Sequence, residues 1–341
     1  MSNVKTQDGA DPARRRLLTH SVVALAAGAA LTNQAAWAQA AQPATPTPAG
    51  SRPGPLESQN QSRPDYVKPY VKTRDGTNLY VKDWGSGRPV VLIHGWPLDA
   101  DMFDRTAMRL AAEGFRVINY DRRGMGRSNQ PYEGYTWDVL SDDLADVMAA
   151  TGADHDVSII GYSMGGGEVA RYMHRHAGKG VVKCGLLASI APGMLKSADN
   201  PHGNPPAGYD GIAAGITADP AKFYAETFLP PFYGVGGPHR ASQNLIDAAV
   251  TTALMMGMKP AVAMAHAFSF GDFVQDMPSI TVPTLILHGT ADPDVPIAAT
   301  AERAAKMIKQ AKLIEYEGHP HAFYATNGEQ MDQDLLAFLK S

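Results

Sequence analysis

The sequence predicts a doubly wound α/β fold, with a mostly parallel sheet and an inserted helical cap. Short apolar segments typical of strands alternate with amphipathic helical segments along most of residues 65–341. One of these strands enters a glycine-rich turn that leads directly into a helix. The alternation stops between about residues 191 and 279, where helical segments follow one another. We interpret that stretch as the cap, the alternative being ordinary helices that cover the sheet.

A targeting segment precedes the predicted domain. Three arginines at 14–16 are followed by two leucines and then by an apolar run at 22–31. Small residues that suit signal cleavage follow at 36–40. The arginines before the leucines resemble a twin-arginine export signal. We therefore expect residues 1–40 to be a signal peptide of a periplasmic or secreted protein, without a stable membrane anchor after cleavage. An ordinary Sec signal and an uncleaved anchor are the alternatives.

Composition limits the remaining possibilities. Residues 41–64 contain six prolines and little that could form a core, so we expect a disordered Pro-rich linker. The net charge of -4, with no long basic run outside the first residues, argues against a nucleic-acid partner. The single cysteine, Cys184, excludes an intrachain disulfide and is expected to be a buried structural thiol. Oligomers are compatible with the sequence, which does not determine the oligomeric state.

The first half of the domain is predicted from its periodicity. Alternating β-prone stretches at 66–73 and 78–84 flank Asp75 and Gly76, a hairpin signal. The solidly apolar segment at 89–93 is typical of a central parallel strand. In order, the next expected elements are a helix at 101–113, a strand at 115–120, a helix at 136–150 that Thr136 could cap, a strand at 157–160 and a helix to about 176.

The second half begins with a strand at 181–190 and continues into the cap, which covers about 191–279. Helical segments are expected there at 219–229, 242–257 and 260–270. Alternation then resumes with a strand at 284–289, a helix at 296–308, a strand at 312–316 and a last helix at 328–340.

The candidate nucleophile is Ser163, at the centre of the Gly-x-Ser-x-Gly motif of residues 161–165. Between a strand and a helix this motif is the nucleophile-elbow pattern. The turn is so tight that side chains at Gly161 and Gly165 would collide with the neighbouring backbone. It would hold the serine hydroxyl clear of the sheet, above the helix N-terminus. The backbone NH of Met164 would then point at negative charge on a substrate oxygen.

A serine nucleophile needs a base, and the base needs a carboxylate to orient it. In enzymes with this elbow the acid and then the histidine follow the serine in the chain. We assign Asp292, after the strand at 284–289, as the acid, with Asp294 as the alternative. We assign His321, after the strand at 312–316, as the base, with His319 as the alternative. The His-x-His pair alone, without a carboxylate or cysteine cluster, is a weak metal signal, so no metal is expected.

The second oxyanion donor is expected to be the NH of Trp96, in the loop that follows the strand at 89–93. Pro97 lacks an NH and stiffens that loop. His94 and His288, which both precede glycine at strand ends, are interpreted as residues that order their loops. The arginines of the polar turn are expected to hold that turn rather than to bind substrate; they are Arg122, Arg123 and Arg127.

Three segments together resemble one family. They are His-Gly-Trp-Pro-Leu-Asp-Ala-Asp-Met at 94–102, Asp-Arg-Arg-Gly-Met-Gly-Arg-Ser at 121–128, and the elbow with its helix at 161–171. They are similar to the α/β-hydrolase family of cofactor-free bacterial haloperoxidases (non-haem chloroperoxidases) and arylesterases, from about residue 66 to the C-terminus. His319, where a small residue is usual, and the long leader depart from the pattern.

The resemblance implies a Ser163, Asp292 and His321 triad, an oxyanion hole from Trp96 and Met164, and no cofactor. It also implies that an ester acylates the serine and that water or hydrogen peroxide removes the acyl group. Proline after the oxyanion-hole tryptophan is shared with members described as perhydrolases. The expected substrates are small apolar carboxylic esters or acids, because the cap is rich in Met and Phe.

Two other functions remain as alternatives. A dehalogenase or epoxide hydrolase would share the fold, but these enzymes place a carboxylate at the elbow, where this chain has Ser163. A non-catalytic binding protein on the same scaffold would usually lack one member of the triad, and this chain has a candidate for each.

Overall fold

The computed structural model describes residues 69–341. The predicted signal peptide and the predicted linker lie outside the described residues. The strands that the structure describes form one eight-stranded sheet in the order β1-β2-β4-β3-β5-β6-β7-β8. Their bounds are β1 Tyr70–Lys72, β2 Asn78–Gly85, β3 Arg88–Ile93, β4 Phe115–Tyr120, β5 Val157–Tyr162, β6 Val181–Leu187, β7 Thr284–Gly289 and β8 Ala311–Tyr316.

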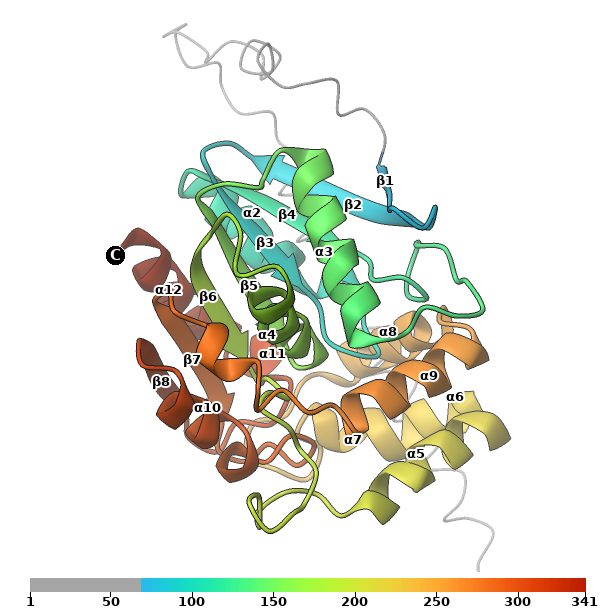
Figure 1. Ribbon diagram of the computed structural model, residues 1–341. Helices are drawn as coiled ribbons and strands as arrows, with labels where there is room; N and C mark the ends of the chain where they lie inside the picture. Colours follow the sequence, from blue (N-terminus) through green and yellow to red (C-terminus); the bar gives the residue numbers. More distant parts are fainter. Residues whose placement is uncertain (1–68) are drawn as a thin grey trace, which may run out of the picture. The chain divides into compact units, whose positions relative to one another are not determined.

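The strands from β4 to β8 in the sheet order are parallel, and among the described strands only β2 runs against them, paired antiparallel with both β1 and β4 (Figure 1). Parallel strands need crossover connections, and helices supply them here. The helices that pack on the two faces of the sheet are α2 Asp104–Ala112 and α12 Gly328–Lys340 on one face, and α3 Trp137–Thr151, α4 Met164–Arg175 and α10 Ala301–Met307 on the other. The predicted doubly wound sheet is therefore confirmed.

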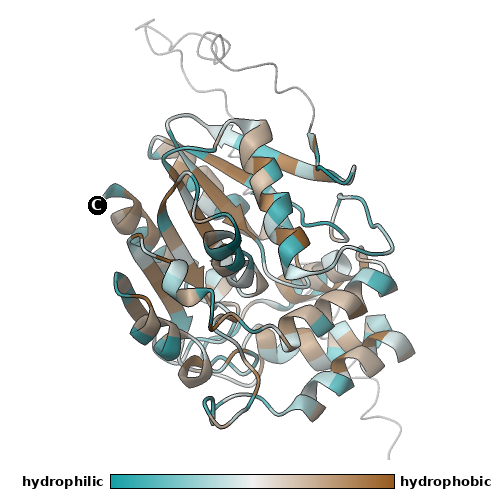
Figure 2. Ribbon diagram, viewed as in Figure 1, coloured by the Kyte–Doolittle hydropathy of each residue, from teal (hydrophilic) through white to brown (hydrophobic). Residues whose placement is uncertain are grey.

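Both faces of the central strands are buried, which explains why these strands are apolar throughout. In β3, Val91 and Ile93 belong to one core while Val90 and Leu92 belong to the other, because side chains alternate along a strand. Figure 2 shows the result, with hydrophobic strands in the middle and hydrophilic positions on the outer sides of the helices. Cys184 lies in β6 and is fully buried, as expected for a structural thiol.

The cap is inserted between β6 and β7 and consists of short helices, yellow to orange in Figure 1. They are α5 Pro206–Ala218, α6 Pro220–Lys222, the π-helix η3 Phe223–Phe228, α7 Leu229–Phe232, α8 Gln243–Leu254 and α9 Met258–Ser269. Within residues 69–341 no single helix is long and apolar enough to span a membrane; α8 and α9, bent by 106° at their junction, pass by length and composition only as a pair.

Several boundaries differ from the sequence prediction. The helix expected at 101–113 is a 3-10 turn, η2 Ala100–Phe103, followed by α2. Asp99 caps that turn by accepting from the NH of Asp101, so the chain enters the helix in a tighter turn than periodicity suggests. The strand expected at 181–190 ends at Leu187.

Four short or glycine-rich elements were not predicted. They are α5, α7, α11 Phe323–Thr326 and the 3-10 turn η4 Met277–Ser279. The helix expected at 296–308 is divided into the 3-10 turn η5 Ile297–Ala299 and α10. Helix α5 contains three glycines, which disfavour a helix in isolation, and it is held by packing against α9 instead. By contrast, α3 begins as predicted, because the Thr136 side chain accepts from the NH of Val139.

Candidate active site

Ser163 occupies the turn between β5 and α4 in a strained conformation. Its φ is 53° and its ψ is -116°, outside the regions that side chains normally favour. The two flanking glycines make the turn possible. A Cβ on Gly161 would lie 2.2 Å from the Gly165 carbonyl oxygen, and one on Gly165 would lie 2.3 Å from that of Ile93. The motif therefore forms the tight strand-to-helix turn that its glycines predict.

A cavity of about 520 Å³ opens beside Ser163, between the carboxyl ends of the strands and the cap. Its wall contains four further residues singled out from the sequence, namely Trp96, Met164, His321 and the alternative acid Asp294. The cap contributes most of the remaining wall through α5, η3, α7 and α9, largely with apolar side chains. Residues far apart in the chain therefore meet in one pocket suited to a small, mostly apolar ligand.

Asp292 and His321 lie on the loops that follow β7 and β8, and their side chains meet. His321 Nδ1 is 2.6 Å from Asp292 Oδ2, and both residues are buried. The other carboxylate oxygen, Oδ1, accepts the NH groups of Asp294 at 2.9 Å and Val295 at 2.8 Å. These contacts fix the carboxylate, which in turn orients the imidazole and leaves Nε2 as the free ring nitrogen.

The electrostatics of this pair favour separated charges. Burial alone would favour neutral Asp292, but the charge of His321 and hydrogen bonds from His288 and His321 outweigh it and hold its pKa below the usual range. For His321, burial opposes the charged form, yet the adjacent Asp292 carboxylate raises its pKa above the ordinary imidazole value. Asp292 is therefore ionised at neutral pH and stabilises a proton on His321.

The sequence left an alternative open at each of these positions. His319 Nδ1 lies 3.0 Å from Thr326 Oγ1, and its ring stacks on His239 with centroids 3.8 Å apart. Asp294 makes no hydrogen bond to His321 among the described residues. The structure thus pairs Asp292 with His321. Within residues 69–341 there is no group of three or more His, Cys, Asp or Glu arranged to hold a metal ion.

The loop after β3 lies directly against the nucleophile. A Cβ on Gly95 would come within 3.1 Å of Ser163 Cβ, so the backbone of Trp96 passes close to the serine. Among the described residues, neither the NH of Trp96 nor that of Met164 has an intramolecular acceptor. Met164 is the first residue of α4, where the helix leaves its NH groups free. Two unpaired donors therefore flank Ser163 at the cavity.

His94 orders this loop, as expected from the sequence. It is fully buried, with Nδ1 2.9 Å from the Gly95 carbonyl oxygen and Nε2 accepting the NH of Arg122 at 2.9 Å. Burial and the charge of Arg122 hold its pKa well below the ordinary value, so the ring is neutral. A neutral ring with Nδ1 protonated satisfies both contacts. His288 likewise orders its own loop, through its Nε2 contact with the Val295 carbonyl oxygen at 2.8 Å.

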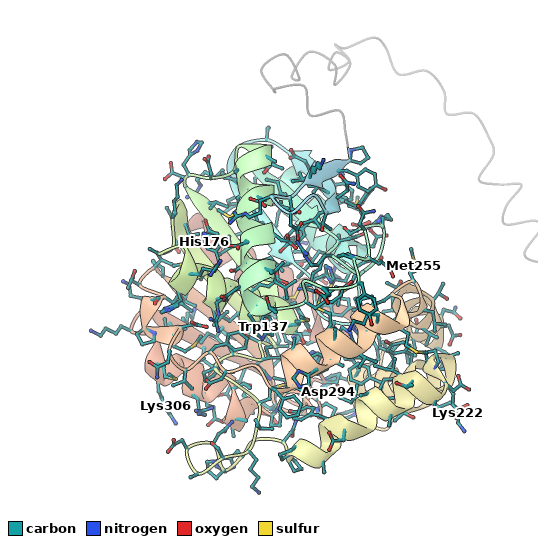
Figure 3. The ribbon with its side chains drawn as sticks, turned by 45° about the vertical axis from the view of Figure 1, so that its right-hand side comes forward. Trp137, His176, Lys222, Met255, Asp294 and Lys306 are labelled. Carbon is teal, nitrogen blue, oxygen red and sulfur yellow. The ribbon has the colours of Figure 1, made fainter. Side chains whose placement is uncertain are left out.

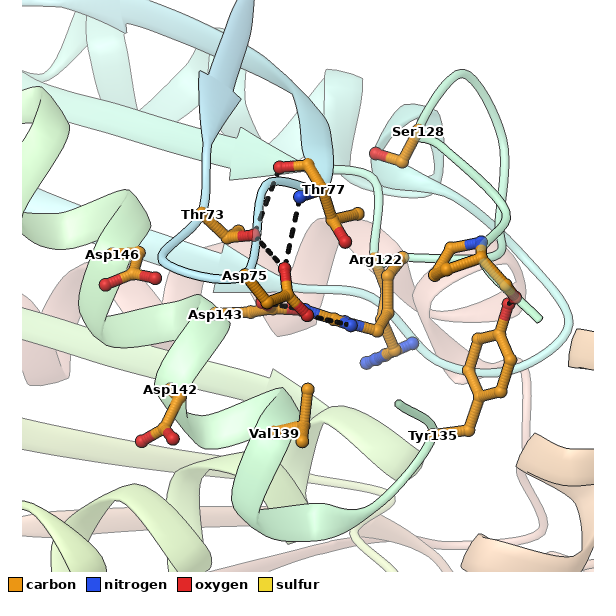
Figure 4. A network of polar contacts seen from close by, with 12 residues as sticks. Thr73, Asp75, Thr77, Arg122, Ser128, Tyr135, Val139, Asp142, Asp143 and Asp146 are labelled. Atoms are coloured by element: carbon orange, nitrogen blue, oxygen red, sulfur yellow. Dashed lines mark hydrogen bonds and ion pairs between the residues drawn. The ribbon is translucent and has the colours of Figure 1, made fainter. Parts of the chain in front are cut away.

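The arginine turn, residues 121–128, supports the loop from behind. Arg122 donates to the His94 carbonyl oxygen at 2.7 Å and forms a fully buried ion pair with Glu168 of α4. Arg123 binds Asp143 of α3 at 2.5 and 2.6 Å and reaches Asp75 at 2.8 Å. Figure 4 shows the Asp75 carboxylate, which also accepts the hydroxyl of Thr73. Arg127 pairs with Asp121 at 2.7 Å. These arginines hold the turn, as the sequence analysis expected.

Two further tyrosines near the triad or the cavity were not singled out from the sequence. Tyr162, next to Ser163, donates its hydroxyl to the His321 carbonyl oxygen and so ties β5 to the loop that carries the base. Tyr209 of α5 lines the cavity, and its hydroxyl is buried without a partner. The signal for Tyr162 was its place in the elbow, whereas Tyr209 lies in a helix that the sequence did not predict.

Comparisons with known proteins agree with this fold. The family profile of the alpha/beta hydrolase fold matches residues 88–327. A non-heme haloperoxidase of Rhodococcus erythropolis is 40% identical over 80% of this chain and 100% of its own length. A bifunctional esterase/perhydrolase of Acinetobacter calcoaceticus is 38% identical over 80% of this chain and 99% of its own. A bromoperoxidase structure from Bacillus anthracis superposes with a TM-score of 0.76 at 34% identity, covering 80% of this chain and 99% of that one.

Proposed function

The chain belongs to the α/β-hydrolase family, among enzymes similar to bacterial non-heme haloperoxidases, and from that premise we propose a specific reaction. It is a serine hydrolase that cleaves small apolar carboxylic esters through an acyl-serine intermediate and also passes the acyl group to hydrogen peroxide. The observation that carries the proposal is the 2.6 Å contact between His321 and Asp292 at the cavity that Ser163 lines.

In the first half of the reaction Ser163 Oγ attacks the ester carbonyl carbon while His321 Nε2 accepts its proton. Asp292 stabilises the imidazolium that forms, without taking the proton itself. The NH groups of Trp96 and Met164 bind the negative oxygen of the tetrahedral intermediate. When that intermediate collapses, the alcohol leaves with the proton from His321, and Ser163 carries the acyl group.

In the second half the acyl group is transferred to water or to hydrogen peroxide. His321 accepts a proton from the attacking molecule, a tetrahedral intermediate forms again, and Ser163 leaves with that proton. Water gives a carboxylic acid, and hydrogen peroxide gives a peracid. The peracid then oxidises halide in solution to hypohalous acid and returns to the carboxylic acid, so no bound cofactor is required.

The names of the relatives support both branches. The relative from Acinetobacter calcoaceticus is described as an esterase and a perhydrolase, and the relative from Rhodococcus erythropolis as a haloperoxidase. The apolar cavity wall supports the choice of apolar esters, because pocket walls commonly match their ligands in polarity.

A paired rate assay tests the proposal. Purified protein is given p-nitrophenyl acetate with and without hydrogen peroxide, and peracid is followed through bromide-dependent halogenation of a dye. We expect ester cleavage without peroxide and dye halogenation with it, and neither with Ser163→Ala. Labelling of folded protein by a fluorophosphonate probe should be lost in the same variant. Full turnover by Ser163→Ala would contradict the proposed nucleophile.

We also propose that the protein is exported by the twin-arginine route, from the arginines that precede Leu17 and Leu18. In a bacterial host, changing Arg14, Arg15 and Arg16 together to lysine should keep the esterase in the cytoplasm. Export that continues unchanged would instead indicate the Sec route. Immunoblots of periplasmic and cytoplasmic fractions distinguish the two.

A further inference from the structure

One wall of the cavity is polar, although most of its lining is apolar. The apolar part includes Ile190, Met194, Ile212, Phe223, Phe228 and Phe268. Besides Thr227 of η3, three polar side chains of the lining lie outside the proposed triad: Asn204, Tyr209 and Asp294. In Figure 3, Asp294 lies where the cap helices meet the sheet domain. The proposed acyl transfer uses none of these three side chains.

The backbone of Asp294 is held on both sides. Its NH donates to Asp292 Oδ1 at 2.9 Å, and its carbonyl oxygen accepts Asn204 Nδ2 at 3.0 Å. The carboxyl group, by contrast, has no partner at Oδ2, although that atom is shielded from solvent. A buried polar atom without a partner is costly, so such an atom at a ligand pocket suggests that the ligand supplies the partner.

Tyr209, on helix α5 of the cap, also has a buried polar atom without a partner. It is 8% exposed, and its hydroxyl is buried without a hydrogen bond among the described residues. Burial raises the pKa of Tyr209, the neighbouring Asn204 side chain lowers it, and the charge of Asp294 adds a smaller rise. Tyr209, Asn204 and Asp294 all line the same cavity. The cap and the loop after β7 therefore each present an unsatisfied polar group to the same cavity.

The charge state of Asp294 follows from its neighbours. Burial raises its pKa to about 7, His321 opposes that shift and Asp292 adds to it. The other polar groups that face this wall, Asn204 and Tyr209, are neutral at that pH. Near pH 7 a large share of the protein thus carries a neutral carboxyl group, which both donates and accepts hydrogen bonds.

We propose that Asp294 and Tyr209 form a polar subsite that binds a hydroxyl group on the acyl chain of the substrate. This inference rests on the proposed esterase function and narrows its substrates to hydroxylated esters. A hydroxyl group both donates and accepts, which matches the two unpaired partners. A carboxylate on the acyl chain would be repelled by Asp292, and an ammonium group would have to lose its water in a largely apolar cavity.

Matched esters test the subsite. The values of kcat/KM are measured for the p-nitrophenyl esters of hexanoic, 3-hydroxyhexanoic and 6-hydroxyhexanoic acid. We expect at least one hydroxylated ester to exceed the plain ester by about 10-fold, since a plain chain leaves buried polar groups unpaired. Asp294→Leu should abolish this preference and improve the plain ester, whereas Asp294→Asn should keep part of the preference. Tyr209→Phe should reduce it about 3-fold or more.

Asp210→Leu is the matched control, because Asp210 is exposed and lies next to Tyr209 on α5. This variant should leave the ratio of kcat/KM for the hydroxylated ester to kcat/KM for the plain ester unchanged. If the wild type cleaves plain and hydroxylated esters equally, and Asp294→Leu changes both alike, the subsite inference is wrong while the esterase function stands.

A binding measurement separates the subsite from catalysis. Calorimetry on Ser163→Ala compares hexanamide with its 3-hydroxy and 6-hydroxy forms, which are not turned over. Tighter binding of a hydroxylated amide, lost on adding Asp294→Leu, supports the subsite even if no ester is cleaved. Equal binding of all three amides overturns it, whatever the wild-type enzyme hydrolyses.

Discussion

The arginine turn and the acid loop, residues 289–296, both contain buried ionisable side chains, but these differ in whether they have partners. In the arginine turn, Arg122 and Arg123 have carboxylate partners that are themselves almost fully buried. In the acid loop, Asp292 is fully engaged, whereas Asp294 Oδ2 lacks a partner and is enclosed. The two loops follow strands of one sheet, so position alone does not explain the contrast.

The difference distinguishes two uses of buried polar groups: paired groups stabilise the fold, and unpaired groups are available to a ligand. A buried charge is tolerated when a partner offsets its lost hydration, and a pair of this kind fixes the surrounding backbone. The arginine turn uses its pairs to hold His94 and the loop of Trp96. A group without a partner stabilises nothing by itself and is available to a ligand. Changes in the arginine turn should therefore lower stability, and changes in the acid loop should alter activity or substrate preference.

The largest expected effect is on the activity side of this contrast. Ser163→Ala should lower kcat for p-nitrophenyl acetate by about 10⁴- to 10⁶-fold, as expected when a serine nucleophile is removed. Its free energy of unfolding, measured in urea, should stay within about 1 kcal/mol of the wild type, because the change removes only one hydroxyl group from a side chain that lines the cavity. A large loss of stability would mean that the elbow serine also supports the fold.

The second effect lies on the stability side. Arg123→Met leaves Asp143 buried without its partner and should lower the free energy of unfolding by about 3–5 kcal/mol. Urea denaturation measures this, and kcat per folded molecule should be unchanged. Arg123→Met combined with Asp143→Leu is the control, because it removes both charges and should recover most of the loss. A reduced kcat in folded Arg123→Met would contradict the comparison, because it would show that the arginine turn also contributes to catalysis.

The third effect is the pH dependence of kcat/KM. His321 must be neutral to accept a proton, so activity should rise about tenfold per pH unit in acid and level off above its pKa. Because Asp292 raises that pKa, the midpoint should lie above the ordinary imidazole value of about 6.5. Asp294 also raises the pKa of His321, so Asp294→Asn should move the midpoint down. An upward shift would contradict the assigned electrostatics.

The smallest effect comes from the exposed partner within the arginine turn. Asp75 pairs with Arg123 but is 45% exposed, whereas Asp143 on the same arginine is 3% exposed. Asp75→Asn should therefore change the free energy of unfolding by only about 0.2–1 kcal/mol. Thermal and urea unfolding measure it beside Arg123→Met. A loss comparable to that of Arg123→Met would show that burial is not what separates strong from weak pairs here.

The sequence predicted those parts of the molecule that depend on short-range patterns. The apolar strands and the capped helix α3 arise from local periodicity and from Thr136. Ser163 was found because its two glycines form a short local motif, although the structural need for Gly165 arises from its contact with Ile93 on β3. Asp292 and His321 were chosen by chain order, and the structure brings these two side chains together.

What the sequence could not predict depends on packing between distant segments. Helix α5, with Gly208, Gly211 and Gly215, is formed against α9 rather than by its own propensity. The unpaired state of Asp294 is equally invisible, because it depends on which cap residues enclose its carboxyl group. Asp294 entered the sequence analysis only as an alternative acid, and its place on the cavity wall emerged from the folded chain.

The cap can diverge while the sheet stays the same, because it is inserted between two strands that are direct neighbours. Leu187 at the end of β6 pairs in register with Leu287 of β7, so the sheet is continuous whatever lies between them. Doubling the length of such an excursion costs only about 0.6 kcal/mol in closure entropy. The part of the cavity wall that the cap supplies can therefore change without a change in the sheet. A mutagenesis library confined to α5 and η3 would vary the cavity wall and leave Ser163, Asp292 and His321 unchanged.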